Sequence, residues 1–284
     1  RGLMEERMER PARERWLRQA LVRVLPNRRL FGSLLRVGQL ARPLVPEPLR
    51  RKIPPKREAS PWPEGSHPRK ALALAGCAQP SATPNTNAAA ARVLDRLDIT
   101  LLEAPTAGCC GAVSYHLGEH DDGLDYMRRN IDAWWPAIEN GAEAIVMTAS
   151  GCGAMVQDYG HLLKDDPAYA DKARRVSELT VDLGAFLLQQ DLDRLGLSNR
   201  QGKVAFHCPC TLQHAMKQNG VVERVLEKAG IHLAETTDKH LCCGSAGTYS
   251  VLQPELSQRL LTNKLAALTV DQPDEIVTAN VGCQ

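Results

Sequence analysis

The sequence lacks the marks of a membrane-spanning or secreted chain. None of its apolar runs approaches the roughly eighteen residues that a spanning helix needs. The chain opens on Arg1-Gly2-Leu3-Met4-Glu5-Glu6, whereas a secretory signal has a charged stretch followed by an apolar one. Hydrophobic residues still make up 43% of the 284 residues, enough for a buried core in one large or two ordinary domains.

Nucleotide-binding motifs are also missing. Neither Gly-x-Gly-x-x-Gly nor a phosphate-binding loop occurs, so nucleotide or flavin binding by this chain has no support. Near the ends, the chain starts on Arg1 rather than Met and stops at Cys283-Gln284 directly after a strand-like run. We expect a fragment of a longer protein, with its second repeat truncated.

Basic residues are concentrated at one end of the chain. Residues 1–70 carry 18 Lys and Arg against 7 Asp and Glu, although the net charge of the whole chain is only +2. We expect the arginine-rich segment 7–36 to dock a partner subunit or an anionic membrane face, with a solvated helix as the alternative. Nucleic-acid binding is disfavoured, because these basic residues accompany helices with few aromatics and the rest of the chain is acidic.

Nine cysteines without a secretory signal indicate a reducing compartment. There, closely spaced cysteines bind metal or carry out redox chemistry more often than they form structural disulfides. We therefore expect a cytoplasmic protein, with peripheral contact at the cytoplasmic face of the inner membrane as an alternative.

Helical and proline-rich patterns divide the first 69 residues. Apolar spacing predicts a helix over 5–25 and a second over 29–41. Eight prolines then interrupt residues 43–69, which predicts a linker without helix or central strand. The expected organisation is a basic helical segment at 1–42, this linker, a first repeat at 70–200 and a second repeat at 201–284.

After the linker, short apolar strands alternate with helical patterns, twice in the same order. This alternation predicts an α/β fold made of two tandem parallel-sheet repeats. Strands are expected at 71–75, 99–103 and 144–148, and again at 203–207, 231–235 and 275–279, with helices at 88–97, 124–139, 221–229 and 255–268.

The cysteines repeat with the same spacing. Thirty-one residues separate Cys77 from Cys109-Cys110, and 31 residues separate Cys210 from Cys242-Cys243. A fourth cysteine in each repeat, Cys152 or Cys283, follows the third predicted strand. All eight lie at or just past the carboxyl ends of parallel strands, where open sheets bind ligands, so four thiols are expected to converge in each repeat.

Fourfold thiolate sulfur selects soft centres, with iron-sulfur clusters and zinc as the main candidates. A cluster is favoured, because no Cys-x-x-Cys zinc knuckle occurs and because adjacent cysteines reach separate irons more easily than one compact ion. A metal-free redox dithiol would explain the Cys pairs but not the other four cysteines. Gly111 and Gly244, after the pairs, are expected to make tight turns that bring backbone amides near sulfur.

The duplicated cysteine pattern resembles the CCG cysteine-rich module of heterodisulfide reductase-type subunits. Longer strings are similar to the glycolate oxidase iron-sulfur subunit family over essentially the whole chain: Gly76-Cys77-Ala78-Gln79-Pro80, residues 206–214, residues 241–249, and Val277-Thr278-Ala279-Asn280-Val281-Gly282-Cys283-Gln284. The family's N-terminal ferredoxin-type cysteine runs are absent from this sequence, and the basic helical opening fits its linker.

The resemblance implies a cofactor and ligands. It implies a 4Fe-4S-type cluster, cubane or noncubane, held by Cys77, Cys109, Cys110 and Cys152 and by Cys210, Cys242, Cys243 and Cys283. Heterodisulfide reductases end each module with Cys-x-x-Cys, but Ala149 and Asn280 replace its first cysteine here. Cys208 is a further candidate ligand in the second repeat, where Ala75 is its counterpart in the first.

The resemblance also implies a role without catalytic residues of its own. The chain would pass electrons from FAD-containing glycolate oxidase subunits toward quinone, and would be inactive on glycolate alone. A thiol-disulfide redox subunit and a lactate-oxidising system are the alternatives. His116, His207, His214 and His240 lie near the cysteines in sequence. Hydrogen bonding to the backbone is the expected role for each, with ligation of iron or proton transfer to quinone as the alternatives.

Overall fold

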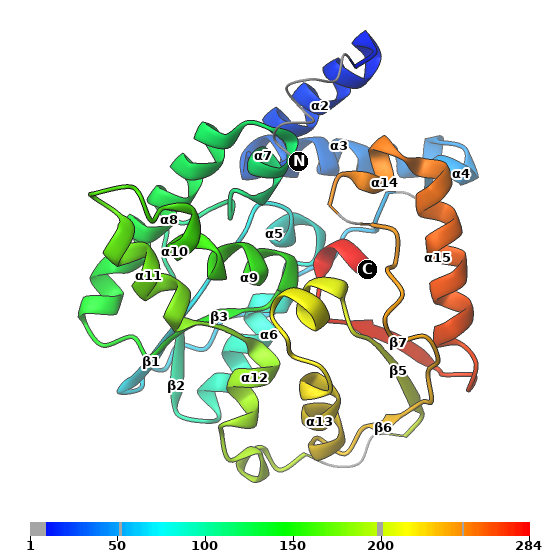
Figure 1. Cartoon of the computed structure of the whole chain (residues 1–284). Helices are drawn as coiled ribbons and strands as arrows, with labels where there is room; N and C mark the ends of the chain where they lie inside the picture. The colour runs from blue at the N-terminus through cyan, green and yellow to red at the C-terminus, as the bar shows by residue number, and fades with distance from the viewer. Residues whose placement is uncertain (1–9, 51–52, 198–200, 246) are drawn as a thin grey trace.

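The computed structural model describes residues 10–50, 53–197, 201–245 and 247–284. It contains two parallel sheets, with strand orders β2-β1-β3-β4 and β6-β5-β7. The predicted fold class, two α/β repeats with parallel sheets, is confirmed. In Figure 1 the first sheet and its helices lie on the left and the second on the right, with the C-terminus between them.

The first module builds its sheet around β1. Short apolar runs make the strands, and β1 pairs with β2 on one side and β3 on the other. The first part of the module comprises β1 (Arg69–Ala73), α5 (Gln79–Ala82), α6 (Asn85–Asp95), β2 (Ile99–Glu103), α7 (Ala112–Leu117), α8 (His120–Glu139) and β3 (Ala144–Met147).

A further section completes the first sheet. Its short strand β4 pairs with β3 through Ile145 opposite Thr180 and Met147 opposite Asp182. The elements are α9 (Ser150–Gln157), α10 (Tyr159–Leu162), α11 (Ala170–Leu179), β4 (Thr180–Asp182), α12 (Leu183–Leu188) and η2 (Leu192–Leu195). The sequence patterns had not indicated this strand.

The second module repeats the arrangement on a smaller scale. Its first strand again lies in the middle, so β6-β5-β7 corresponds to β2-β1-β3. The elements are β5 (Lys203–His207), η3 (Thr211–Ala215, a π-helix), α13 (Val221–Lys228), β6 (His232–Leu233), α14 (Tyr249–Leu252), α15 (Pro254–Leu268), β7 (Glu275–Thr278) and η4 (Val281–Cys283). In the described residues this sheet has no counterpart of β4.

The two modules differ in how deeply they bury apolar side chains. In the first, Leu72, Ile145 and Met147 from the sheet pack with Ile131 and Trp134 of α8, and all five are at most 1% exposed. In the second, a smaller cluster contains Phe206, Cys208, Leu212 and Met216. Burial of apolar surface is the main favourable contribution to folding, so we expect the first module to be the more stable of the two.

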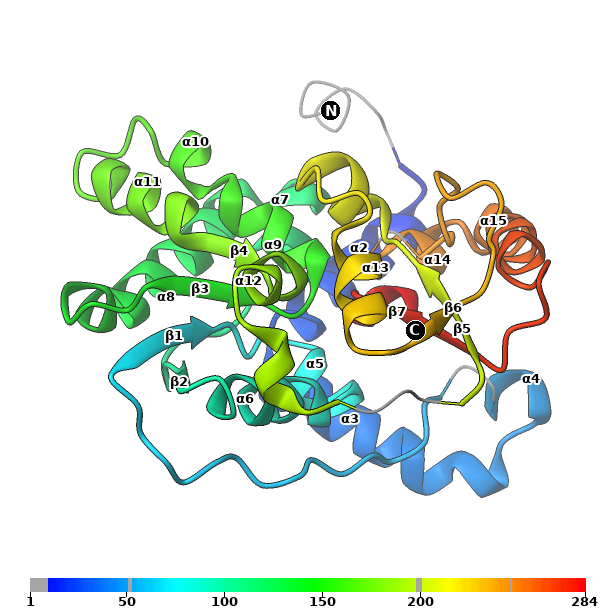
Figure 2. The same ribbon diagram turned by 90° about the horizontal axis from the view of Figure 1, so that it is seen from below.

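The N-terminal helices touch both modules. α2 (Ala12–Val24) packs against α7 of the first module and α14 of the second, and α3 (Arg28–Ala41) packs against α5. Figures 1 and 2 show α3 running along both modules. The predicted helix over 5–25 is confirmed from Ala12; residues 5–9 lie outside the described residues.

The prediction that the proline-rich stretch holds no helix is wrong at its start. One-turn helices occupy η1 (Arg42–Leu44) and α4 (Glu47–Arg50). Pro43 lies in the first turn of η1, where the missing backbone N–H is not needed. In the described part of the chain, no helix combines the length and apolarity required to cross a membrane.

Candidate metal centres

The first site gathers four sulfurs from three strand ends. Cys77 follows β1, the pair Cys109-Cys110 follows β2, and Cys152 lies in the first turn of α9 after β3. Hydrogen bonds link the thiols in a chain of neighbours, Cys77 to Cys109, Cys109 to Cys110 and Cys110 to Cys152. The four cysteines predicted for the first repeat are therefore brought together.

The thiols of this site differ in pKa. Hydrogen bonds from Cys109 and Cys152 hold the pKa of Cys110 well below its usual range, despite its burial. The pKa values of Cys109 and Cys152 are raised, mainly because each donates to Cys110. A thiolate is the form that binds metal, so Cys110 is prepared as a ligand.

Two buried polar side chains fix the loop that carries the Cys109-Cys110 pair. Asn130 of α8 accepts from Gly108 N at 2.9 Å and donates to Cys109 O at 2.8 Å. Tyr159 donates its hydroxyl to Cys110 O at 2.9 Å and accepts from Asn130 at 3.0 Å. Both side chains are 0% exposed, so these hydrogen bonds hold the pair without competition from water.

The predicted tight turns after the Cys pairs are confirmed. Gly111 has φ +87° and Gly244 has φ +81°, and both fall in the left-handed region that favours glycine. Gly111 N donates to the Cys109 sulfur at 3.4 Å, and Gly244 N donates to the Cys242 sulfur at 3.3 Å. The same amide-to-sulfur contact thus occurs in both modules.

The second site gathers the four remaining predicted ligands. Hydrogen bonds link Cys210 to Cys242 and Cys243 to Cys283. The pKa of Cys243 is lowered to about 4, chiefly by the hydrogen bond from Cys283 and further by His207. Cys243 therefore corresponds to Cys110 in its charge as well as in its position.

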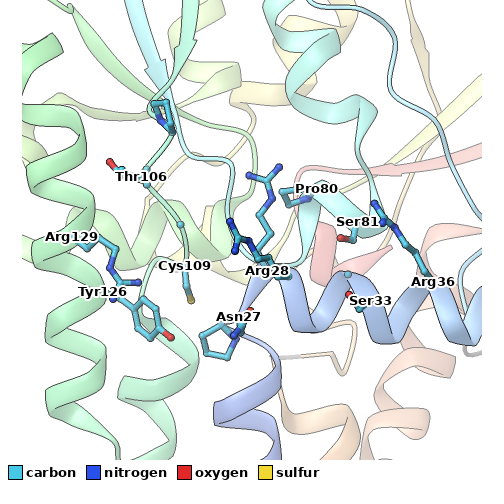
Figure 3. Close-up of a pocket in the computed structure, with 16 residues that line it drawn as sticks. Asn27, Arg28, Ser33, Arg36, Pro80, Ser81, Thr106, Cys109, Tyr126 and Arg129 are labelled. Carbon is cyan, nitrogen blue, oxygen red and sulfur yellow. The ribbon is translucent and has the colours of Figure 1, made fainter.

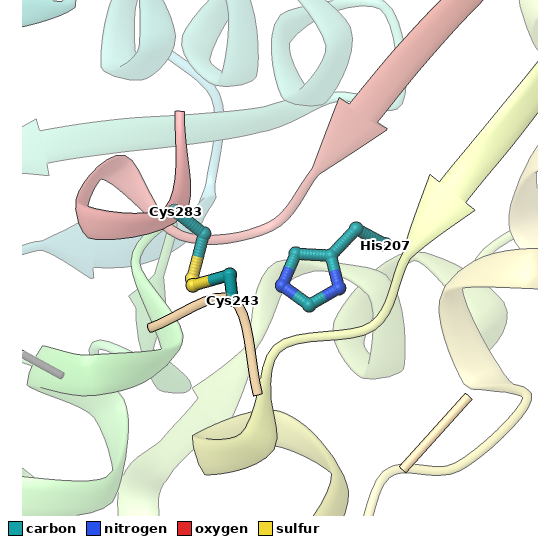
Figure 4. A group of neighbouring side chains, drawn as sticks. All are labelled: His207, Cys243 and Cys283. Carbon is teal, nitrogen blue, oxygen red and sulfur yellow. The ribbon is translucent and has the colours of Figure 1, made fainter. Parts of the chain in front are cut away.

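His207, at the end of β5, joins the second site. Figure 4 shows its ring directed toward Cys243, with Cys283 on the other side of Cys243. Within the described residues, His207, Cys243 and Cys283 are the one group of three possible metal ligands whose donor atoms all lie within 4.8 Å of one another. The expected backbone hydrogen bond is not found for His207 in the described residues; its ring nitrogens are buried, and the ring interacts with the Cys243 sulfur instead.

The other histidines and Cys208 lie elsewhere. His116, His214 and His240 have exposed side chains. The Cys208 side chain packs in the apolar cluster of the second module, and burial raises its pKa to about 12. The structure thus places Cys208 in the core of the module, beside the site rather than among its linked thiols.

A buried lysine fixes the loop before the second Cys pair. Lys264 of α15 is 2% exposed and donates to Asp238 O at 3.3 Å and to Lys239 O at 3.1 Å. Asn130 has the equivalent role in the first module. Because Asn130 is neutral and Lys264 carries an ammonium group, the second site is the more positively charged of the two. Sequence patterns missed both residues, although they occupy matching places on α8 and α15.

The two sites lie next to each other. Ser150, beside Cys152, donates from its backbone N to Ala279 O at 3.1 Å, and its hydroxyl lies 2.8 Å from the Thr211 hydroxyl. Val281 lines a cavity of about 60 Å³ together with Cys77 and Cys152. The loop that carries Cys283 therefore closes over the first site.

A basic pocket opens beside the first site. It has a volume of about 890 Å³, and Cys109 contributes to its wall. Arg28, Arg29 and Arg36 from α3 and Arg129 from α8 line it, without any Asp or Glu among the lining residues. Figure 3 shows α3 forming one wall and α8 another. The pocket gives an anionic group access to the edge of this site.

The fold and the two sites define the class of protein: two α/β modules in tandem, each with a cysteine-rich site of four thiols. The cysteine-rich domain model CCG matches residues 71–157 and 204–284. The chain is 54% identical over 285 residues to the glycolate oxidase iron-sulfur subunit of Escherichia coli (strain K12), covering 100% of this chain and 70% of that protein. This chain therefore belongs to the glycolate oxidase iron-sulfur subunit family.

More distant relatives share the same region. The chain is 29% identical over 268 residues to the probable glycolate oxidase iron-sulfur subunit of Bacillus subtilis (strain 168), covering 94% of this chain and 58% of that protein. It is 27% identical over 201 residues to lactate utilization protein A of Bacillus licheniformis, covering 70% of this chain and 82% of that protein.

Proposed function

We propose that this chain is an electron-transfer subunit in which each thiol site holds an iron-sulfur cluster. It would receive electrons from a flavoprotein that oxidises glycolate and pass them toward quinone. The observation that supports this most strongly is the pair of convergent four-thiol sites at matching strand ends. The glycolate substrate is proposed from the names of the relatives.

The residues present fit such clusters. All nine cysteines are free thiols, and the eight in the two sites are buried or half-buried. Lowered pKa values at Cys110 and Cys243 supply thiolate donors. The amide-to-sulfur hydrogen bonds of Gly111 and Gly244 stabilise negative charge on the ligands. A 4Fe-4S-type centre in each module is the proposal, with Cys77, Cys109, Cys110 and Cys152 and then Cys210, Cys242, Cys243 and Cys283 as its ligands.

When bound, such a cluster accepts and releases single electrons. The chain's own residues hold the sulfurs, exclude water and set the local charge. Asn130 and Lys264 fix the loops of the two Cys pairs. The closeness of the two sites suits transfer between them. Because the sequence contains no motif that would bind a flavin or nicotinamide as hydride acceptor, we expect the chain to be inactive on glycolate without the flavoprotein.

The arginine-lined pocket and α3 suit docking of a partner subunit. Beside the pocket arginines, α3 exposes Leu34, Val37 and Leu40, which are 51%, 64% and 81% exposed. A large apolar patch bordered by charge is typical of a protein-protein contact. An acidic edge of the partner would then approach Cys109 through the pocket.

The test is an optical titration of the anaerobically prepared protein. We expect broad visible absorption from the clusters, unchanged by glycolate alone and bleached by glycolate once the flavoprotein is added. Lactate serves as the matched second substrate. A colourless protein that reduces disulfides through Cys109-Cys110 would instead support the thiol-disulfide alternative, and turnover of glycolate by the isolated chain would contradict the proposal.

A further inference from the structure

His207 is a buried imidazole whose ring faces the Cys243 sulfur. The side chain is 3% exposed, and in the described residues its ring nitrogens make no hydrogen bond of normal geometry, although the ring interacts with the Cys243 sulfur. A buried polar group that lacks a well-formed hydrogen bond is destabilising, and a bound metal would satisfy it. The ring faces the Cys243 sulfur, and the donor atoms of His207, Cys243 and Cys283 lie within 4.8 Å of one another.

The first module shows what this position looks like without a histidine. Leu74 occupies the corresponding place after β1, and it packs in the apolar cluster that contains Cys110. Cys110 is the counterpart of Cys243. An apolar side chain is therefore sufficient to support this part of the fold, so packing alone does not explain an imidazole in the second module.

Two other differences between the modules concern the same site. Asn280 donates to the Cys283 sulfur at 3.4 Å, whereas Ala149 has the equivalent place three residues before Cys152. Lys264 replaces Asn130 as the side chain that holds the Cys-Cys loop. Polar or cationic groups thus replace apolar or neutral ones at three positions around the second set of sulfurs.

We propose that His207 supplies a nitrogen ligand to the cluster of the second module, whereas the first module binds through sulfur alone. This inference rests on the proposed function, because it requires a cluster at Cys210, Cys242, Cys243 and Cys283. His207 would join the four cysteines as a fifth ligand, and a neutral imidazole gives an iron-sulfur centre a higher reduction potential than a thiolate at the same place. The Lys264 ammonium and the hydrogen bond from Asn280 to the Cys283 sulfur favour the reduced form of the second site, so electrons would pass from the first module to the second.

The test uses the full chain labelled with ¹⁵N-histidine and prepared anaerobically. Pulsed electron paramagnetic resonance of the reduced protein should show a histidine nitrogen bound directly to iron. The signal should vanish in His207→Leu, which copies the first module, and persist in His240→Leu, whose histidine is exposed. In His207→Cys, which keeps a ligand at this place, iron should be retained while one midpoint potential shifts downward.

Each other outcome overturns the inference. A weak nitrogen coupling, typical of a hydrogen bond to sulfur, would exclude direct ligation even in protein replete with iron and sulfide. A strong coupling that persists in His207→Leu would assign it to another histidine. Zinc in place of iron and sulfide would overturn the proposed function as well, and metal analysis separates that result from the first two. If His207→Leu fails to fold, His207→Cys replaces it in the test: the nitrogen signal should vanish in this variant as well, and its persistence would overturn the inference.

Discussion

Replacing Gly111 with Ala should disrupt the first site through one identifiable steric contact. A Cβ atom at this position would lie 2.6 Å from Gly123 O, closer than real Cβ atoms approach backbone oxygen. The left-handed backbone costs a non-glycine residue about 1–2 kcal/mol. Overpacking against a rigid backbone costs about 1–3 kcal/mol more. We therefore expect Gly111→Ala to lower the free energy of unfolding by about 2–5 kcal/mol and to reduce the iron content.

Gly118 provides a matched control at the other end of the same helix. It has φ +101°, but a Cβ there meets nothing within 4 Å. Gly118→Ala should therefore cost only the backbone part, about 1–2 kcal/mol, and should keep its iron. Urea unfolding and iron analysis of both variants make the comparison. Equal destabilisation of the two, or full iron in Gly111→Ala, would refute the steric explanation.

Three further changes test other parts of the structure. Burial raises the pKa of Asp182 from 3.8 to about 6, so its contribution to stability falls as pH rises through this window. The free energy of unfolding of Asp182→Asn, measured in urea relative to that of wild type, should therefore rise by about 3 kcal/mol between about pH 4 and about pH 7. A difference that does not change with pH would contradict this. Asn130→Leu should lower the iron content, because it leaves Gly108 N and Cys109 O without their hydrogen-bond partner. Unchanged iron content would show that the loop keeps its conformation without Asn130. Arg129→Glu should weaken association with the flavoprotein in a salt-sensitive way, and Arg13→Glu, outside the pocket, should not; equal effects would exclude the pocket as the docking site.

The sequence was sufficient for the parts of the fold that repeat or alternate. The apolar runs around Leu72 and Ile145 were identifiable because they are short, buried and flanked by helical patterns. The convergence of the cysteines followed from strand ends and from the equal spacing of the two sets. By contrast, β4 spans only three residues, Thr180–Asp182, and contains too little alternation to indicate a strand.

Other features depend on contacts between distant residues. Lysine is seldom buried, so nothing in the local sequence singles out Lys264 as the anchor of the second Cys pair. The hydrogen bonds of Asn130 and Tyr159 join α8, the Cys109-Cys110 loop and α10, which no spacing rule connects. The sequence placed His207 near the cysteines, but only the folded protein shows that its ring is buried against the Cys243 sulfur.

The most direct measurement is the iron and acid-labile sulfide content of anaerobically prepared single and double cysteine variants. Cys110→Ser should remove the cluster of the first module, Cys243→Ser that of the second, and the double variant both. Each single variant should therefore keep about half of the wild-type iron if the two sites load equally. Cys208→Ser is the matched control, because this thiol lies in the apolar core, and it should keep its iron. Unchanged iron and sulfide in Cys110→Ser and Cys243→Ser would contradict the assignment of one cluster to each module.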